Sequence, residues 1–360
     1  MSTSPEVREN TADSSPLLEI EDLNIHFDTG NGIAEVINGV GLKLEAGKVH
    51  GLVGESGSGK SVTSRAVMDL LPRQRMVTRT GSIKFKGREI MDLNEDQMRE
   101  SIRGKHVSMV FQDPMTALNP VMRIGMQLAL PMIRHFGISK KAALVRAEEL
   151  LGQVGIPHPA ERLRSFPHEM SGGQRQRVMI AIALACDPEL LIADEPTTAL
   201  DVTVQAQILD LFDRLRKERN LAILLVSHDL SLIAERCDHV SVMYAGRIVE
   251  SGPAEEIFNH PEHPYTKLLE EARPSMDTPP HTVLQTIPGS PPQLVDLPPG
   301  CSFANRCPLA TEICRHERPL LLARGDKRVV ACHHDLYAAD AVDLSAGSHP
   351  ANSSDSTGVR

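Results

Sequence analysis

Tryptophan is absent from this 360-residue chain, and only three tyrosines are present. Proteins that hold single-stranded nucleic acid commonly stack its bases on aromatic rings above a basic groove, and proteins that hold duplexes neutralise phosphates with lysine and arginine. Here the formal net charge is −9, with 47 acidic against 38 basic side chains. We therefore expect no nucleic acid among the partners of this chain.

Long apolar runs are also missing. The longest uninterrupted run, residues 178–186, has nine residues, whereas a helix needs ~20 apolar residues to cross a bilayer. The N-terminus lacks the basic stretch and the apolar core of a secretory signal. We expect a chain that does not span a membrane by itself and that works in the cytoplasm.

Two kinds of segment predict an α/β fold. Short β-type runs, such as 49–53 and 221–226, alternate with longer helical patterns, which is typical of a parallel sheet flanked by helices. Glycine turns inside 82–90 and 242–249 predict some antiparallel sheet beside that core.

Composition divides the chain into parts of different character. The two ends are polar and predict disordered tails, and a proline-rich stretch predicts an extended connector. The expected parts are tails at 1–16 and 336–360, a core over 17–270 with a helical subdomain at about 113–167, a connector over 271–300, and a small cysteine-rich module over 301–335.

A glycine-rich loop predicts a phosphate-binding site. It matches the pattern G-x-x-x-x-G-K-[ST] and lies between a β-type run and a helix-like segment. In such a loop the backbone N–H groups point at phosphate oxygens, Lys60 reaches the β- and γ-phosphates, and Ser61 ligates Mg²⁺. The eight residues are Gly54, Glu55, Ser56, Gly57, Ser58, Gly59, Lys60 and Ser61.

An acidic pair, Asp194 and Glu195, ends the apolar run 190–193. Taken alone, such a pair is more often the solvated end of a strand. Together with the phosphate loop it predicts catalysis, with Asp194 holding Mg²⁺ through water and Glu195 acting as general base on the attacking water.

The segment 171–177, Ser-Gly-Gly-Gln-Arg-Gln-Arg, distinguishes among the many enzymes that carry these two elements. Its residue types predict the start of a helix with a polar face. It also resembles the signature sequence of ABC ATPases, in which this element caps the γ-phosphate bound by the opposite subunit. The positions concerned are Ser171, Gly172, Gly173 and Gln174.

Other positions follow the order of the same family. Gln112 resembles the Q-loop glutamine that senses Mg²⁺ and the attacking water, Asp201 at the end of 199–201 resembles the D-loop aspartate, and His228 resembles the switch histidine. Phe27 is expected either to stack on adenine or to be an ordinary core residue.

The resemblance covers about residues 17–270 and implies a P-loop ABC cassette with a RecA-like core, an antiparallel β subdomain and an α-helical subdomain. It implies hydrolysis of ATP, with Mg²⁺, at a site that the signature of a second cassette completes. The partners it implies are a second ABC ATPase subunit in a heterodimer and two transmembrane permease subunits. The chain would then lie peripherally on the cytoplasmic face of the inner membrane.

A His-Pro-Tyr sequence at 263–265 resembles a segment of the ATPases of oligopeptide, dipeptide and nickel importers. From its residues alone it is a proline-initiated helix. The resemblance implies import of di- or oligopeptides that an extracytoplasmic peptide-binding protein delivers, with nickel import as the alternative.

Four of the six cysteines lie close together near the C-terminus, in the spacing C-x5-C-x6-C-x17-C: Cys301, Cys307, Cys314 and Cys332. This spacing is neither that of a zinc ribbon nor that of a ferredoxin, so it leaves metal and no metal equally open. A small module with little apolar content needs a staple to fold, and the resemblance implies a structural [4Fe–4S] cluster. Zinc is the alternative, with His333 or His334 as replacement ligands. Cys186 and Cys237 are expected in the core.

Two rival classes are less consistent with the sequence. ABC ATPases outside transport usually have two cassettes in one chain, a long coiled coil or a basic surface, and the sequence predicts none of these. An iron–sulfur redox protein that binds ATP does not account for the complete set of hydrolytic motifs.

Overall fold

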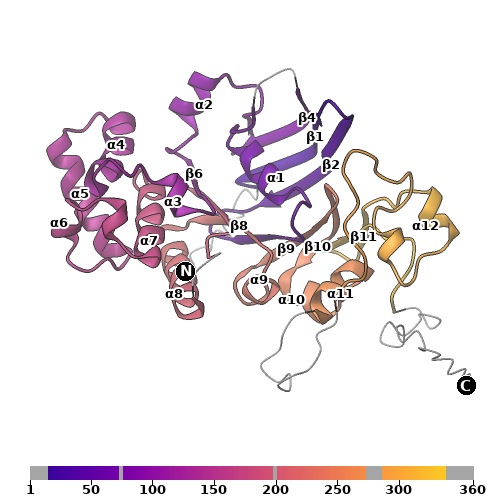
Figure 1. Cartoon of the computed structure of the whole chain (residues 1–360). Coiled ribbons are helices and arrows are strands. Elements are labelled where there is room, and N and C mark those ends of the chain that lie inside the picture. Colours follow the sequence, from indigo (N-terminus) through magenta and orange to yellow (C-terminus); the bar gives the residue numbers. More distant parts are fainter. Residues whose placement is uncertain (1–14, 73–75, 198–200, 273–285, 338–360) are drawn as a thin grey trace, which may run out of the picture.

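The computed structural model describes residues 15–72, 76–197, 201–272 and 286–337. A large sheet runs through the middle of the molecule, a second sheet lies beside it, and a group of helices stands at the opposite end (Figure 1). In spatial order, the strands of the large sheet are β11 (Leu322–Arg324), β12 (Arg328–Val330), β10 (Arg247–Pro253), β9 (His239–Tyr244), β3 (Val49–Val53), β8 (Ala222–Ser227), β7 (Leu190–Asp194) and β6 (Val107–Val110).

The central strands of this sheet are parallel and buried. β3 pairs with β8, β8 with β7, and β7 with β6, all in parallel register, and every residue of these four strands is buried. Because parallel strands end at one edge of the sheet, the loops after β3, β7 and β8 meet there. The strands predicted at 49–53 and 221–226 are confirmed, the second shifted by one residue.

The smaller sheet is antiparallel, with the strand order β2-β1-β4-β5. Its strands are β1 (Leu18–Asp28), β2 (Ile33–Leu44), β4 (Val77–Phe85) and β5 (Arg88–Glu89). The expected antiparallel pairs are therefore confirmed, since β4 and β5 come from the segment 82–90, and β9 and β10 from 242–249.

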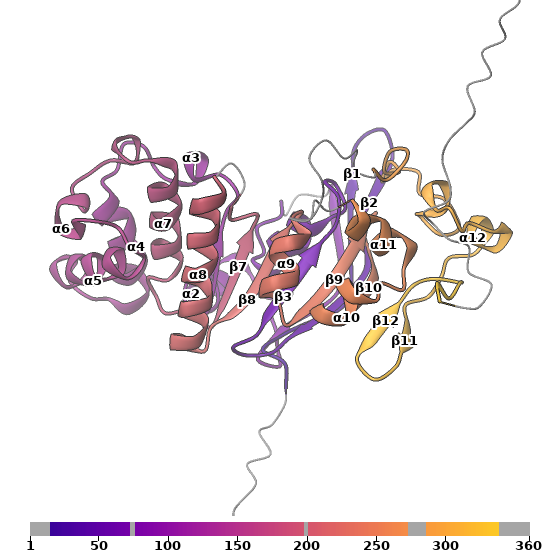
Figure 2. The same cartoon turned by 90° about the horizontal axis from the view of Figure 1, so that it is seen from below.

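Short helices fill most of the stretch that was predicted to be helical, and they gather away from the antiparallel sheet (Figures 1 and 2). Local signals set their ends: Ser139 caps one helix by accepting a bond from Ala142 N–H, and Gly137, at φ 64°, ends another. They are α3 (Pro114–Ala117), α4 (Ile124–Phe136), α5 (Lys140–Gln153), α6 (Pro159–Arg162) and the 3₁₀ turn η1 (Pro167–Glu169), followed by α7 (Gly172–Ala183).

The remaining helices flank the sheets or lie near the C-terminus. They are α1 (Lys60–Val67), α2 (Glu95–Ser101), α8 (Val202–Arg219), α9 (Leu230–Arg236), α10 (Ala254–Asn259), α11 (Pro264–Glu271), η2 (Ala304–Arg306) and α12 (Glu312–His316). Across the four described stretches, no helix is long and apolar enough to cross a membrane.

The C-terminal segment, which we define as residues 286–337, shares the large sheet with the rest of the chain. Its strand β12 pairs with β10, with Glu250 opposite Val330 and Ser251 opposite Val329, and β11 adds one more strand at the edge (Figure 2). The residues expected to form a separate module at 301–335 thus continue the central sheet. Residues 1–14 of the predicted tail 1–16, residues 338–360 of the predicted tail 336–360, and residues 273–285 of the predicted connector lie outside the described residues.

Candidate active site

The glycine-rich loop joins the end of β3 to the start of α1. Gly54 has φ 150°, and a Cβ added there would lie 2.0 Å from the carbonyl oxygen of Met243, so only glycine fits. Lys60 Nζ donates hydrogen bonds to the carbonyl oxygens of Gly54 at 2.8 Å and Glu55 at 2.9 Å. Burial lowers the pKa of Lys60. The ammonium group therefore sits inside the loop with its charge little screened by water, as phosphate binding requires.

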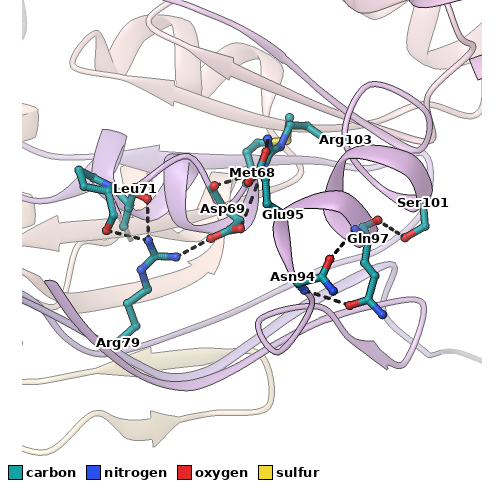
Figure 3. Close-up of polar contacts among 10 residues, drawn as sticks. Met68, Asp69, Leu71, Arg79, Asn94, Glu95, Gln97, Ser101 and Arg103 are labelled. Atoms are coloured by element: carbon teal, nitrogen blue, oxygen red, sulfur yellow. Dashed lines mark hydrogen bonds and ion pairs between the residues drawn. The ribbon is translucent and has the colours of Figure 1, made fainter. Parts of the chain in front are cut away.

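The opposite end of α1 is tied down by two arginines (Figure 3). Arg79, from β4, donates to the Asp69 carboxylate at 2.6 Å and to the Leu71 carbonyl at 2.7 Å. Arg103 donates to the Met68 carbonyl at 3.0 Å and to the Glu95 carboxylate at 2.7 Å. Because the last carbonyls of a helix have no partner within it, these contacts fix α1 and hence the loop at its other end.

Asp194 and Ser61 lie side by side beneath the loop. The Ser61 hydroxyl donates to Asp194 Oδ1 at 2.9 Å, and Asp194 is 2% exposed. Burial raises the pKa of Asp194, and the bond from Ser61 opposes that shift. A hydroxyl and a carboxylate oxygen at hydrogen-bond distance are the kind of hard oxygen ligands that Mg²⁺ takes, so the two residues fit the predicted ion.

Two side chains from other loops, Gln112 and His228, contact the Glu195 carboxylate. Gln112 Nε2 donates to Glu195 Oε2 at 2.8 Å, and His228 Nδ1 lies 3.3 Å from Glu195 Oε1. Glu195 itself has φ 47°, which is uncommon for a residue other than glycine and costs ~1 kcal/mol or more of backbone strain. Gln112 and Glu195 are 83 positions apart in the sequence, and the fold brings them together.

An open cavity of about 650 Å³ connects the loop to this triad. Val36 from β2, Val62 from α1 and Leu294 from the C-terminal segment also line it, and no sequence pattern predicted these three residues. Phe27 is not one of the described residues that line it; this side chain lies on β1 and packs against the core beside the antiparallel sheet. The cavity lining comprises Val36, Ser56, Gly57, Gly59, Lys60, Ser61, Val62, Gln112, Glu195, His228 and Leu294.

The signature residues lie outside this cavity, at the start of α7. Ser171 and Gln174 cap the helix reciprocally: Gln174 N–H donates to Ser171 Oγ at 3.3 Å, and Ser171 N–H donates to Gln174 Oε1 at 3.1 Å. A Cβ at Gly172 would meet nothing within 4 Å. Gly173 follows it in the first turn of the same helix. The start of α7 is therefore accessible to a second molecule.

Asp201 caps the next helix, α8, by accepting a hydrogen bond from Val204 N–H at 2.9 Å. Residues 199 and 200 of the predicted D-loop lie outside the described residues. The buried Gln176 of α7 donates to the Pro196 carbonyl at 2.6 Å and so connects the signature helix to the turn after Glu195.

Four cysteines converge in the C-terminal segment. Cys301, Cys307, Cys314 and Cys332 line one cavity of about 10 Å³, which holds at most about one water. Burial raises the pKa of Cys301 to about 11 and that of Cys307 to about 12. As the described side chains stand, no group of three or more histidines, cysteines or acids could hold a metal ion. The predicted cluster is thus unsupported in this arrangement, although the four thiols do face one another.

The other predicted positions in and near this segment are placed as follows. His334 Nε2 lies 3.3 Å from Cys314 Sγ, and His333 Nε2 lies 2.9 Å from the Glu317 carbonyl. His263 and Pro264 begin α11, as predicted. Cys186 is buried and Cys237 packs against the same core, which confirms that prediction.

Comparisons with known proteins agree with this geometry. The ABC transporter family matches residues 37–198, and the family described as oligopeptide/dipeptide transporter, C-terminal region, matches residues 249–314. In fold, the chain resembles the ATP-binding cassette MJ0796 in a dimeric post-hydrolysis state bound to ADP and Pi. The TM-score is 0.59 at 26% identity, over 66% of this chain and 99% of that one. The fold and the site are therefore those of an ATP-hydrolysing cassette of the ABC class.

Two relatives that match this chain over most of their length indicate which family of ABC ATPases it belongs to. The dipeptide transport ATP-binding protein DppD of Bacillus subtilis is 45% identical over 334 residues, 91% of this chain and 99% of DppD. The oligopeptide transport ATP-binding protein OppD of Escherichia coli is 49% identical over 304 residues, 84% of this chain and 89% of OppD. The chain belongs to this family of dipeptide and oligopeptide transport ATP-binding proteins.

Proposed function

We propose that this chain is the motor subunit of a peptide importer: it binds ATP at residues 54–61 and hydrolyses it to drive the import of di- or oligopeptides. The observation that carries the proposal is the meeting of Gln112, Glu195 and His228 at the rim of the phosphate-loop cavity. The cargo is inferred from the relatives, which are described as dipeptide and oligopeptide transport ATP-binding proteins.

Phosphate binding is assigned to the loop. Its backbone N–H groups and the start of α1 offer donors to the phosphate oxygens, and Lys60 exchanges its bonds to the loop carbonyls for bonds to the β- and γ-phosphates. Ser61 directly and Asp194 through water would hold Mg²⁺, which would supply charge neutralisation at the β- and γ-phosphates.

Hydrolysis is assigned to Glu195. Its carboxylate accepts a proton from the attacking water, while Gln112 and His228 fix its two oxygens. When ATP binds, His228, which is 59% exposed, exchanges its contact with Glu195 for a contact with the γ-phosphate. Ser171, Gly172, Gly173 and Gln174 serve the site of a second cassette, and the open space at Gly172, at the start of α7, is consistent with that role.

The assembly follows from this division of labour. A second ABC ATPase subunit places its own signature residues over the nucleotide bound by this chain, in keeping with the dimeric state of the MJ0796 cassette. Two transmembrane permease subunits and an extracytoplasmic peptide-binding protein complete the importer, and this chain lies peripherally on the cytoplasmic face of the inner membrane. The helices of 113–167 are then the surface that meets the permeases, with 17–270 as the cassette.

Uptake of a labelled short peptide tests the function. Cells that lack the gene are complemented with the wild-type chain, with Glu195→Gln, or with Glu218→Gln as a control for an exposed glutamate elsewhere. Wild type and Glu218→Gln should restore uptake and Glu195→Gln should not, because loss of a general base costs ~10²–10⁴-fold in turnover. Uptake that never depends on the chain would contradict the peptide assignment, and nickel uptake would then be measured.

A [4Fe–4S] cluster on Cys301, Cys307, Cys314 and Cys332 is part of the proposal. The number and kind of donors suit it, since four thiolates hold such a cluster, and backbone N–H groups of Phe303 and His334 point at two of the sulfurs. The thiols must rotate outward to take it, because the present cavity is far smaller than a cluster. When bound, the cluster supplies a cross-link in a segment with a small core.

Iron content tests that part. Protein purified under strictly anaerobic conditions should carry iron and sulfide, Cys307→Ser should lose both, and Cys186→Ala should keep them. Iron-free wild-type protein would contradict the proposed cluster. Zinc in place of iron would favour the alternative, in which His334, beside Cys314, is a candidate ligand.

A further inference from the structure

An ion pair joins the phosphate loop to the C-terminal segment. Arg306 Nη1 and Nη2 donate to the two carboxylate oxygens of Glu55 at 2.6 and 2.9 Å, across 251 residues of sequence. The Arg306 side chain is 5% exposed and that of Glu55 is 25% exposed. Two parallel bonds from one guanidinium to one carboxylate fix direction as well as distance, and such pairs are among the strong hydrogen bonds of proteins.

Arg306 is itself held firmly. Its Nε donates to the Pro288 carbonyl at 2.8 Å and its Nη1 to the Tyr244 hydroxyl at 3.3 Å. The guanidinium also lies 5.8 Å from the centre of the Tyr244 ring. The bonds to Glu55 raise the pKa of Arg306, so its charge is permanent. A side chain fixed at this many points can orient the group that it binds.

The backbone of Glu55 is attached to a second element. Its N–H donates to the Tyr265 hydroxyl at 2.8 Å, and Tyr265 lies fully buried on α11. The rings of Tyr244, Tyr265 and Phe303 pack together with centroids 4.6 to 5.3 Å apart. Lys60 also donates to the Glu55 carbonyl. The position of the loop and of its lysine therefore depends on Glu55, which Tyr265 and Arg306 hold in place.

We propose that Arg306 is a positioning residue for the phosphate loop, so that the affinity for nucleotide depends on the C-terminal segment. The inference rests on the proposed function, namely on nucleotide binding at 54–61. Without Arg306, the Glu55 carboxylate would leave the phosphate loop with a negative charge that has lost its guanidinium partner, which opposes the binding of an anionic ligand. The loop would also lose an anchor, and donors that are not held in place beforehand bind less tightly.

Calorimetric titration of the full-length chain with MgADP tests this. Arg306→Gln should raise the dissociation constant by about tenfold to a hundredfold, the range of typical couplings between sites. Arg315→Gln, which removes the same charge from an exposed position of the same segment, should leave it within about twofold. Arg306→Lys keeps the charge but loses the two-point geometry and should give an intermediate loss of about fivefold, which serves if Arg306→Gln does not fold.

A double-mutant cycle separates positioning from simple folding. When Glu55→Gln removes the carboxylate, adding Arg306→Gln should cost less than half as much, on a logarithmic scale, as it does in the otherwise wild-type chain. An equal loss in both backgrounds, or no loss in either, would overturn the proposal while leaving ATP binding intact. A wild-type chain that binds no MgADP would overturn the proposed function together with it.

Discussion

Gln112 donates a hydrogen bond to Glu195 at 2.8 Å, just beyond the ends of the neighbouring strands β6 and β7. The other carboxylate oxygen of Glu195 lies 3.3 Å from His228 Nδ1. Both oxygens of the proposed general base are therefore oriented before any ligand arrives. Orientation of this kind affects the chemical step more than the binding of nucleotide.

Gln112→Ala should accordingly lower kcat for ATP by roughly 10–100-fold, less than the full contribution of a general base, with little change in KM. Phosphate release by the assembled transporter measures both constants. Gln97→Ala, which changes an exposed helix cap on α2, should leave kcat unchanged. A rise in KM at constant kcat would mean that Gln112 binds nucleotide and does not orient Glu195.

Two glycines of the phosphate loop should respond differently to alanine. A Cβ at Gly54 would lie 2.0 Å from the Met243 carbonyl, whereas one at Gly57 would meet nothing within 4 Å. Gly54→Ala should therefore abolish nucleotide binding. Gly57→Ala carries only the strain of φ 79°, about 1–2 kcal/mol, and should bind nucleotide about thirtyfold more weakly at most. Equal effects in a MgADP titration would contradict this.

Arg328 and Glu250 form a second buried pair between the C-terminal segment and the cassette. Glu250 is 0% exposed and accepts bonds from Arg328 and from the N–H groups of Glu262 and His263. Arg328→Ala leaves this carboxylate buried without its counter-charge, which typically costs about 3–5 kcal/mol. Denaturant unfolding should reveal the loss, and Lys327→Ala, at the exposed neighbouring position, should change stability by about 0.5 kcal/mol or less.

His50 should make folding stability depend on pH. This side chain is 2% exposed on β3, and burial together with the nearby His239 lowers the pKa of His50 to about 3. In the unfolded chain its pKa is about 6.5, so between these values the unfolded state alone binds the proton, and stability falls as pH drops below about 6.5.

Each such histidine contributes a slope of about 1.4 kcal/mol per pH unit. Unfolding free energies measured from about pH 6.5 to about pH 5.5 should fall less steeply for His50→Gln than for wild type. The matched control is His316→Gln, since the His316 side chain is 68% exposed. Parallel slopes for all three proteins would show that His50 is not the titrating group.

Local signals explain what the sequence could predict. The run at 49–53 has five buried positions and ends at the glycine-rich loop predicted to bind phosphate. The helical subdomain expected at about 113–167 contains α5, which Ser139 caps. Glu195 was predicted from its place at the end of an apolar run, whereas Gln112 and His228 were predicted only from their resemblance to motifs of the ABC ATPases. Their roles stay predictions, but the meeting of Gln112, Glu195 and His228 is a property of the fold.

What could not be predicted depends on contacts between distant segments. Arg306 stands in a polar stretch where no periodicity marks it, and its partner lies 251 residues away. Leu294 stands in a short proline-flanked stretch without a helical or strand pattern, and only the path of the chain brings it to the nucleotide cavity. β11 and β12 have three residues each, too few for an alternating pattern to stand out. Phe27 could belong to either a core or a cavity until the pairing of β1 was known.

The two buried ion pairs have a consequence for chimeric proteins. In each pair the acid belongs to the cassette, as Glu55 and Glu250, and the arginine belongs to the segment that follows it, as Arg306 and Arg328. In a chimera that joins this cassette to an unrelated C-terminal segment at the proline-rich stretch, the two carboxylates would lose their arginine partners. In the reciprocal chimera, the two arginines would lose their carboxylates. Gene fusion and recombination should therefore give a stable protein only when the cassette and the C-terminal segment come from the same parent.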